Sequence, residues 1–410
     1  MSDAGGGMIA PARNPSIAIQ AGRLFVICMG PSLGGLVPLA IAIAQPALAQ
    51  HFGGGDDGRL LARQLFALPS LAIMVGAPLG GVLAERFGYR LSLLLALLVY
   101  GVGGSAGLVI DGFWALLVSR LALGLAGGTV MAIYLALAAA YYEGTARAKV
   151  MGFAVATSAL VGALSLELGG RLVDWGGWRA PFAMYLLGVV TLAVAWATVK
   201  GPFHQRRRTV RAPGSPGALR VIAALWPIYL VLLILSIGTF MSSAGGPFLI
   251  KANGIASATQ QGHILSAGSI PAIFTAFAYG FLRRWFSDRV LVVMTAGLMG
   301  TGLILAVPLH TEFLLLGAFL VAGLGTGMKA PAVSSVLMAE APENVRAVAA
   351  GLSFSGIFLG QFLAPNLLEI TDRFFGIHGG FLAMGGALLT VALAVTIFGI
   401  GKKQPTGQTA

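Results

Sequence analysis

The chain has 410 residues, of which 57% are hydrophobic and only 10% charged, and its formal net charge is +12. Soluble globular domains carry about 25% charged residues, and single soluble cores stop growing at roughly 250–300 residues. This composition excludes a water-soluble protein, and we expect the lipid bilayer to cover much of the surface.

Long apolar stretches divide the chain into two sets of predicted membrane spans. A helix needs about 20 apolar residues to cross about 30 Å of hydrocarbon. Six such stretches come first, near 24–48, 63–84, 91–109, 113–140, 150–172 and 181–199. Six more follow, near 221–249, 262–282, 290–309, 313–339, 347–369 and 380–401. We therefore predict an all-α membrane protein of twelve transmembrane helices, with a six-helix bundle at 1–199, a linker at 200–220 and a second six-helix bundle at 221–410.

Basic residues are unevenly distributed between the two sides of the predicted membrane. Of the 26 Lys and Arg residues, two lie within spans and six in loops on one side, which leaves 18 on the side of the chain ends. Cytoplasmic loops are enriched in Lys and Arg. We therefore expect a bacterial inner-membrane protein with both termini in the cytoplasm, and no binding of nucleic acid. The six residues on the other side are Arg59, Arg63, Arg171, Arg179, Lys251 and Arg373.

Glycines recur between the two predicted halves at a constant offset of 199 residues. Each pair falls in the equivalent span of its half, which indicates a parallel internal repeat. The pairs are Gly81 with Gly280, Gly124 with Gly323, Gly128 with Gly327 and Gly152 with Gly351.

The loop after the second span carries Gly81, Glu85, Arg86, Gly88 and Arg90. This spacing resembles the signature loop of the major facilitator superfamily, with glutamate where the family usually has aspartate. The resemblance implies two six-helix bundles and a cytoplasmic latch that holds the inner gate shut in one conformation. The alternative is an ordinary basic turn on the cytoplasmic side. A weaker copy follows the repeat at Gly280, Arg283, Arg284 and Arg289.

Arg120 lies inside the fourth span and is followed by Gly124. The pair resembles the second motif of the superfamily. An arginine in the bilayer costs roughly 2.5–3.5 kcal/mol even on insertion scales, so it should face the bundle interior. We expect a role in proton transfer or substrate binding, and the alternative is a side chain that extends to the interface.

The fifth span contains Ser165, Glu167, Gly169 and Gly170, which resembles in part the motif of proton-coupled drug exporters. The glycine-proline pair of that motif is absent here. Glu167 is the one carboxylate that we expect within a span, and we take it as the candidate for proton coupling. The alternative is a local ion pair with Arg171, four residues later on the same helix face.

Lys329 lies about sixteen residues into the tenth span, which is glycine-rich and contains a proline. A deep ammonium favours a binding group for an anionic or polar substrate, and the alternative is a pair with a carboxylate on another helix. Polar residues in other spans are candidates for the same cavity or for helix packing. They are Gln361, Asn366, Tyr134 and Gln45.

The leading interpretation is a monomeric secondary transporter that exports a small amphiphilic or drug-like compound in exchange for protons. A second interpretation is uptake of an organic anion, with Arg120 and Lys329 as counter-charges. A non-transporting receptor is a third. We find no nucleophile paired with a base, no phosphate-binding glycine-lysine loop and no metal-ligand cluster, so we expect neither an enzyme nor a cofactor.

Overall fold

The computed structural model describes residues 16–200, 218–342 and 345–398, and within these ranges it contains helices and no strand. The helices before the linker are α1 (Ile17–Ala42), α2 (Gln45–His51), α3 (Gly55–Phe87), α4 (Tyr89–Ser105), α5 (Phe113–Tyr141), α6 (Gly144–Gly176) and α7 (Leu187–Thr198). Two 3₁₀ segments join them, η1 (Ala106–Leu108) and η2 (Gly177–Leu186). After the linker come α8 (Ala218–Ala252), α9 (Ala258–Ala267), α10 (Ser269–Leu282), α11 (Asp288–Leu305), α12 (Glu312–Glu340) and α13 (Arg346–Phe398).

Ten apolar helical stretches in the described residues are long enough to cross a membrane. Two of them, Gly144–Thr198 and Val348–Phe398, have 55 and 51 residues. A helix of that length would extend about 77–83 Å, far beyond one bilayer. Each is broken by a glycine with φ +68°, Gly177 in the first and Gly376 in the second. Each stretch therefore contains two spans, in agreement with the twelve that the sequence predicts.

Several predicted boundaries move for local reasons. The first span ends at Ala42, because α2 begins anew with Pro46 in its first turn. The second begins at Gly55 rather than near 63, with Asp56 and Asp57 in its first turn, where acidic side chains favour the helix dipole. Most of the predicted linker, residues 201–217, lies outside the described residues.

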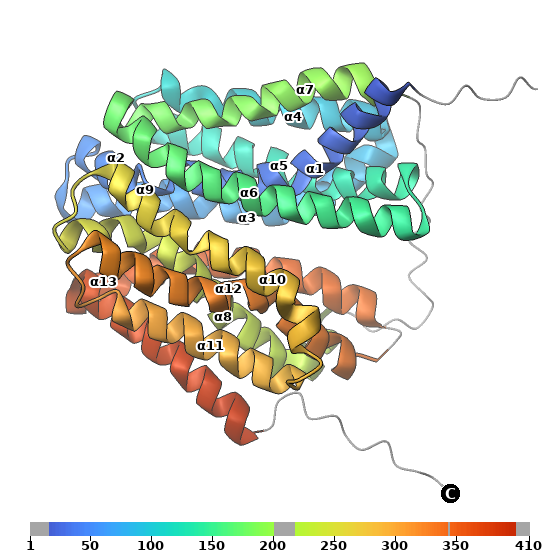
Figure 1. Ribbon diagram of the computed structural model, residues 1–410. Helices are drawn as coiled ribbons and strands as arrows, with labels where there is room; N and C mark the ends of the chain where they lie inside the picture. Colours follow the sequence, from blue (N-terminus) through green and yellow to red (C-terminus); the bar gives the residue numbers. More distant parts are fainter. Residues whose placement is uncertain (1–15, 201–217, 343–344, 399–410) are drawn as a thin grey trace, which may run out of the picture.

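The helices form two groups that lie side by side (Figure 1). Helices α1 to α7 occupy one half of the molecule and α8 to α13 the other. The first and last described residues lie at the same end. We call this end of the molecule the terminal end and the opposite one the distal end.

The same helix contacts occur in both halves. A Cβ added to Gly124 or Gly128 would lie less than 3.0 Å from a carbonyl oxygen of α3, Pro69 O or Ile73 O. In the second half, Gly323 and Gly327 of α12 approach the carbonyls of Gly268 and Ala272 in the same way. Every member of the second set follows its counterpart by 199 residues. At these two glycine pairs the offset seen in the sequence is therefore a repeat of close helix packing. The other two pairs have open space around their Cβ positions, namely Gly81 with Gly280 and Gly152 with Gly351.

Basic residues at the terminal end repeat with the same offset. Arg90 on α4 donates to Trp196 O on α7 at 3.3 Å, and Arg289 on α11 donates to Val395 O on α13 at 2.9 Å. Both bonds tie the third span of a half to its sixth span.

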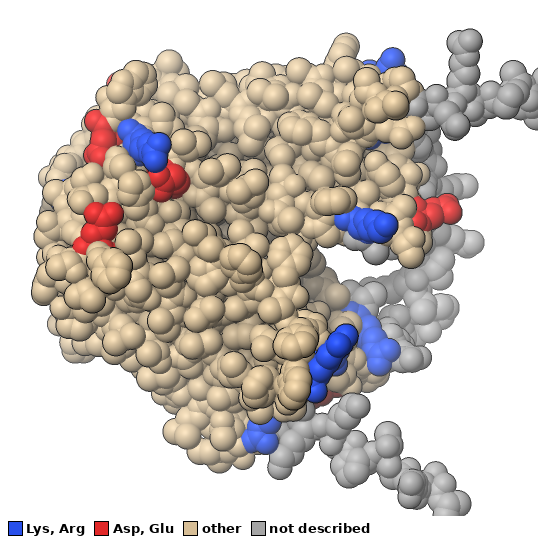
Figure 2. All heavy atoms as spheres, in the orientation of Figure 1, with Lys and Arg blue, Asp and Glu red and all other residues tan. Residues whose placement is uncertain are grey.

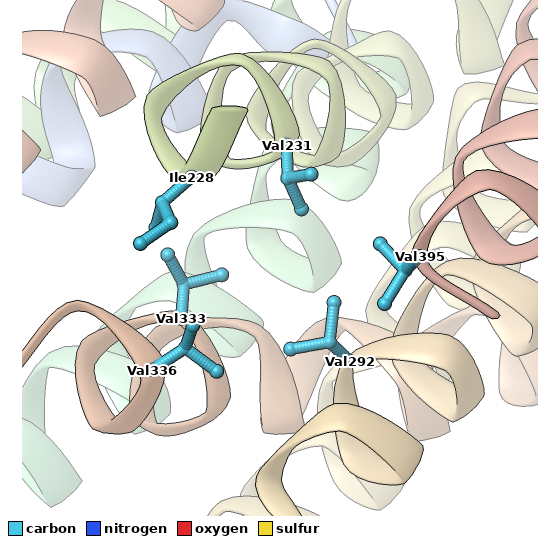
Figure 3. A pocket seen from close by; sticks show the side chains of 6 residues that line it. All are labelled: Ile228, Val231, Val292, Val333, Val336 and Val395. Carbon is cyan, nitrogen blue, oxygen red and sulfur yellow. The ribbon is translucent and has the colours of Figure 1, made fainter. Parts of the chain in front are cut away.

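Large apolar side chains cover the outside of the bundle, as lipid contact requires. Trp114, Phe274 and Leu393 are 76%, 70% and 60% exposed. Inside the second half, a void of about 10 Å³ is lined only by valine and isoleucine side chains that point toward one another (Figure 3). A volume of this size is no more than one water occupies, so the void belongs to the core and not to a substrate site.

Candidate functional site

The two ends of the molecule differ. At the terminal end the surface is hollowed between the two halves, whereas the distal end is continuous (Figure 2). A hollow of about 560 Å³ also opens on the second half, lined by Arg283, Ser334, Ser335, Met338, Ala339 and Arg346. Contacts between the halves therefore concentrate at the distal end.

An ion-pair cluster joins α3 to α13 at the distal end. Arg63, which is 1% exposed, pairs with Glu369 and also donates to Asp372 Oδ2 at 2.7 Å. Arg59 Nε lies 3.8 Å from the same Asp372 oxygen. Within α13, Arg373 Nε lies 3.1 Å from Glu369 Oε1. Because Arg63 and the carboxylates come from different halves, this cluster holds the distal end closed.

A second closure joins α6 to α9. A Cβ on Gly170 would lie less than 3.0 Å from Ala258 O, so only a glycine permits this approach. The Asp174 carboxylate accepts bonds from the Ala258 and Thr259 amides at 3.1 and 2.8 Å. An α6 carboxylate thus satisfies free amides at the N-terminus of α9, where negative charge is favoured. Of the glycine pair of the fifth span, Gly170 therefore serves contact between the halves, whereas Gly169 faces Ala40 and Met184 of its own half.

Glu167 takes part in the same closure. Its Oε1 accepts from Arg171 at 2.8 Å, the local pair that the sequence allowed as an alternative. The same oxygen lies 2.9 Å from His263 Nε2 on α9, and His263 Nδ1 lies 3.7 Å from Glu312 Oε1 on α12. An imidazole therefore lies between carboxylates from the two halves.

Gln45 and Asn366 also bridge the halves at the distal end. Gln45 Nε2 donates to Ser243 O on α8 at 3.0 Å. Asn366 Oδ1 on α13 accepts from Gln64 Nε2 on α3 at 3.0 Å. Both predicted cavity residues are engaged in contacts between the halves in this conformation.

Lys329 lies in the second half, 7% exposed. Its Nζ donates to the Thr239 hydroxyl on α8 at 3.0 Å and lies 5.6 Å from the Phe240 ring centroid. In the described part of the chain no carboxylate forms an ion pair with it. The buried ammonium is therefore held by one neutral hydroxyl and one aromatic ring.

Arg120 lies in the interior of the first half and is 1% exposed. Its guanidinium donates to the carbonyls of Gly103, at 3.0 Å, and Gly104 on α4. It also lies 4.6 and 4.7 Å from the rings of Phe182 and Tyr185. The side chain does not extend to the interface, and its contacts join α5 to α4 and η2.

The two remaining cavity candidates, Tyr134 and Gln361, are both buried. The Tyr134 side chain, 8% exposed, packs on Gly30 of α1. Gln361 is 1% exposed, and its Nε2 has no hydrogen-bond partner among the described residues. The structure thus places Tyr134 in the first half and Gln361 on α13 of the second.

The loop that resembles the superfamily signature lies at the terminal end and is exposed. Gly81 has open space around its Cβ position, and Gly88 adopts φ +82° at the start of α4. Arg86 stacks on Phe87 at 5.4 Å. Glu85 is exposed and forms no ion pair within the described ranges. Of the loop's charged side chains, only Arg90 binds a distant element, α7.

The sequence did not lead us to the carboxylate that is most buried among the described residues, Glu369. Glu167 was expected to be the only carboxylate within a span, but Glu369 lies inside α13 and is 7% exposed, so that expectation is wrong. Its apolar surroundings are tolerated because Arg63 and Arg373 neutralise it. The spacing of Arg59 and Arg63 by four residues, and of Glu369 and Asp372 by three, puts each pair on one helix face and could have indicated the cluster.

Comparison with known proteins agrees with this architecture. The Major Facilitator Superfamily model matches residues 25–365 and, in a second match, 228–410. The 3-(3-hydroxy-phenyl)propionate transporter of Escherichia coli (strain K12) is 24% identical over 93% of this chain and 94% of its own. The methylenomycin A resistance protein of Bacillus subtilis (strain 168) is 24% identical over 78% and 82%.

Two further similarities differ in extent. The hexuronate transporter of Bacillus subtilis (strain 168) is 28% identical over 38% of this chain, and the match spans 36% of that relative. The crystal structure of a D-xylose-proton symporter superposes with a TM-score of 0.75, covering 94% of this chain and 99% of the other, at 16% identity. The structural match concerns the fold.

Proposed function

Since the chain belongs to the major facilitator superfamily, a family of membrane transporters, we propose that it is a secondary transporter that carries a small organic anion by alternating access. The observation that carries the proposal is Lys329, a buried cation without a carboxylate partner in the described residues. The proposal needs two features: a substrate site that opens to one side of the membrane at a time, and a group in that site that binds negative charge.

Alternating access is supported by the difference between the closed distal end and the hollowed terminal end. The halves are joined at the distal end by the Arg63 cluster and by the α6–α9 closure, and they are separated by a hollow at the terminal end. We propose that this is the inward-facing conformation, with the termini in the cytoplasm, because the sequence pattern assigns 18 of the 26 basic residues to the side of the chain ends. The exposed loop at Glu85 is then the released form of the latch.

The site for negative charge is supported by a comparison of three buried cations. Arg63 has two carboxylates, and Arg120 has two carbonyls and two aromatic rings. Lys329 has one hydroxyl and one ring. An isolated buried ammonium is strongly unfavourable, and a substrate carboxylate at Lys329 would offset that cost. The Phe240 ring suits an apolar or aromatic substrate body.

Counterflow in proteoliposomes tests the proposal. Purified protein is reconstituted, preloaded with 3-phenylpropionate and exposed to labelled 3-phenylpropionate, its neutral amide or the corresponding amine, with and without a pH gradient. We expect exchange of the acid, weak exchange of the amide and none of the amine. Exchange of the amine or amide in preference to every acid of a wider panel would contradict an anion site.

A second candidate is proton-coupled export of an amphiphilic compound. It is favoured by similarity to the methylenomycin A resistance protein and by the position of Glu167 against His263. Inverted vesicles discriminate the two candidates. An exporter accumulates an amphiphilic cation or neutral dye when the lumen is acidified, whereas an organic-anion transporter does not.

A further inference from the structure

We propose that a groove on the lipid-facing side of the first half is a binding site for one anionic phospholipid. An acyl chain lies in the groove, and the headgroup phosphate binds Arg86. The groove has a volume of about 330 Å³ and is lined by side chains of α3, α4 and α5. We call it the α4 groove. The proposal concerns the protein's outer surface and does not depend on which substrate is transported.

The floor of the α4 groove consists of small side chains and its rim of large ones. Ser92, Ala96, Ala126 and Thr129 form the floor and are at most 7% exposed. On the rim, Leu95 is 51% exposed. A transmembrane helix is about 10–12 Å across with its side chains, so such a rim would hold it away from the floor. A single unbranched acyl chain is narrower and can reach the floor.

The α4 groove follows the terminal half of the membrane. It runs from Phe87 to Leu79 on α3 and from Leu91 to Val99 on α4, which is about 12 Å at 1.5 Å per residue. One leaflet contributes about 15 Å of hydrocarbon, half of the bilayer core. The α3–α4 turn at Gly88 lies at the headgroup end. A chain that enters there therefore follows the groove through most of one leaflet, the cytoplasmic one in the proposed orientation.

Two of the four floor positions carry larger side chains in the second half. Ser92 and Thr129 correspond, 199 residues later, to Leu291 and Met328, which are 0% and 2% exposed. The other floor residues, Ala96 and Ala126, correspond to Thr295 and Gly325. Both halves have an outer face in lipid, so contact with bulk lipid does not account for this difference. The difference favours a specific occupant on the first half.

Arg86 places a positive charge at the headgroup end of the α4 groove. It follows Leu83 by three residues, which puts it on the groove side of α3, and its guanidinium lies 5.4 Å from the Phe87 ring. Among the described residues Arg86 forms no ion pair. Glu85 follows Leu83 by two residues and therefore lies on another face of the helix. The second half has Trp285 at the position equivalent to Arg86, so the cation belongs to the first half alone.

Ser92 supplies a hydrogen-bond donor one turn below the headgroup level. Its hydroxyl is buried and has no hydrogen-bond partner among the described residues. It lies four residues after Gly88, about one turn into α4. The glycerol ester carbonyls of a phospholipid lie on the membrane side of the phosphate, so Ser92 can donate to a carbonyl while Arg86 binds the phosphate. Such a bond would offset the cost of a buried, unpaired hydroxyl.

Native mass spectrometry of the purified, delipidated protein tests the proposal. The protein is titrated with phosphatidylglycerol and, separately, with phosphatidylethanolamine that has the same acyl chains. We expect one phosphatidylglycerol to bind more tightly than any further copy and more tightly than phosphatidylethanolamine, which carries no net charge. Glycerophosphoglycerol, which has the headgroup but no chains, should not displace it.

Three variants test the three parts of the site. Ala96→Leu fills the floor and should abolish the first binding step. Arg86→Gln should weaken it about fivefold, because a basic residue near the membrane surface contributes about 1 kcal/mol. Ser92→Ala keeps the shape of the groove and should weaken binding about two- to tenfold. Melting temperatures measured in parallel identify a variant that fails to fold.

Arg284→Gln is the matched control, because it removes an exposed arginine at the terminal end of the second half. It should leave the first binding step unchanged. Equal affinity for the two lipids, or wild-type affinity in both Arg86→Gln and Ser92→Ala, overturns the proposal. So does cross-linking of Leu95→Cys, in a Cys28→Ala background, to a helix of another protein or copy in the native membrane. Counterflow is measured separately, so failure of the lipid site leaves the proposed transport function standing.

Discussion

Gly177 and Gly376 lie 199 positions apart and adopt the same backbone conformation, φ 68° with ψ −165° and 173°. Each forms the turn between the fifth and sixth spans of its half. The conformation is one that only glycine adopts without strain. The two halves thus repeat a reversal of chain direction as well as the packing of their helices.

We predict that Gly177→Ala and Gly376→Ala each lower stability by about 1–3 kcal/mol, the cost of a side chain in this backbone region. Thermal unfolding in detergent, followed by tryptophan fluorescence, measures the change. Gly81→Ala is the matched control, because Gly81 lies within α3 with open space around it and alanine favours a helix. Equal melting temperatures for Gly177→Ala and Gly81→Ala would show that the turn adapts without strain.

Lys329→Met should weaken binding of an anionic substrate by about 10–100-fold, since a hydrogen bond to a charged group contributes about 1.5–3 kcal/mol. Binding of the neutral amide should change little. Concentration-dependent counterflow with both compounds gives the comparison.

Thr239→Val is the control for Lys329, because it removes the hydroxyl that the ammonium binds and keeps the charge. It should weaken acid binding less than Lys329→Met does. A parallel loss of acid and amide binding, together with a lower melting temperature for Lys329→Met, would assign the lysine to packing.

The double variant Glu85→Gln with Arg86→Ala should slow transport and leave folding unaffected. Both side chains are exposed in this conformation, where the proposed latch is released, so surface substitution should alter stability by less than about 0.5 kcal/mol. Initial rates in proteoliposomes, normalised to inserted protein, test this. Wild-type transport rates in the double variant would contradict a latch role for Glu85 and Arg86.

Glu167→Gln tests the coupling role of this carboxylate. If Glu167 carries the proton, the variant should lose accumulation driven by a pH difference and keep substrate-for-substrate exchange. Glu312→Gln is the comparison, since Glu312 contacts the same His263 at the longer distance of 3.7 Å. If Glu167→Gln still accumulates substrate against its gradient, Glu167 does not carry the proton. Its role is then structural, through its pairs with Arg171 and His263.

The sequence alone was sufficient for the fold. Apolar stretches of spanning length predicted the helices, because a lipid-embedded backbone must satisfy its hydrogen bonds within each helix. The glycine pairs at an offset of 199 predicted the repeat, and at two of the four pairs the reason is close helix contact, which requires a small residue at the crossing. Gly124 and Gly323 confirm this with the same contact in both halves. These features are local or periodic, so a single sequence is enough to predict them.

Only the tertiary structure decided which charges meet. Arg63 and Asp372 are 309 residues apart in the chain and 2.7 Å apart in space. The spacing of charges within each helix indicates a charged face, but it does not say which distant helix supplies the partner. Arg120 and Lys329 look alike as single cations in apolar spans. Yet Arg120 is surrounded by carbonyls and rings, whereas the polar and aromatic partners of Lys329 among the described residues are Thr239 and Phe240. The energy of a buried charge depends on partners from other helices, and their identity is fixed only when the two halves pack together.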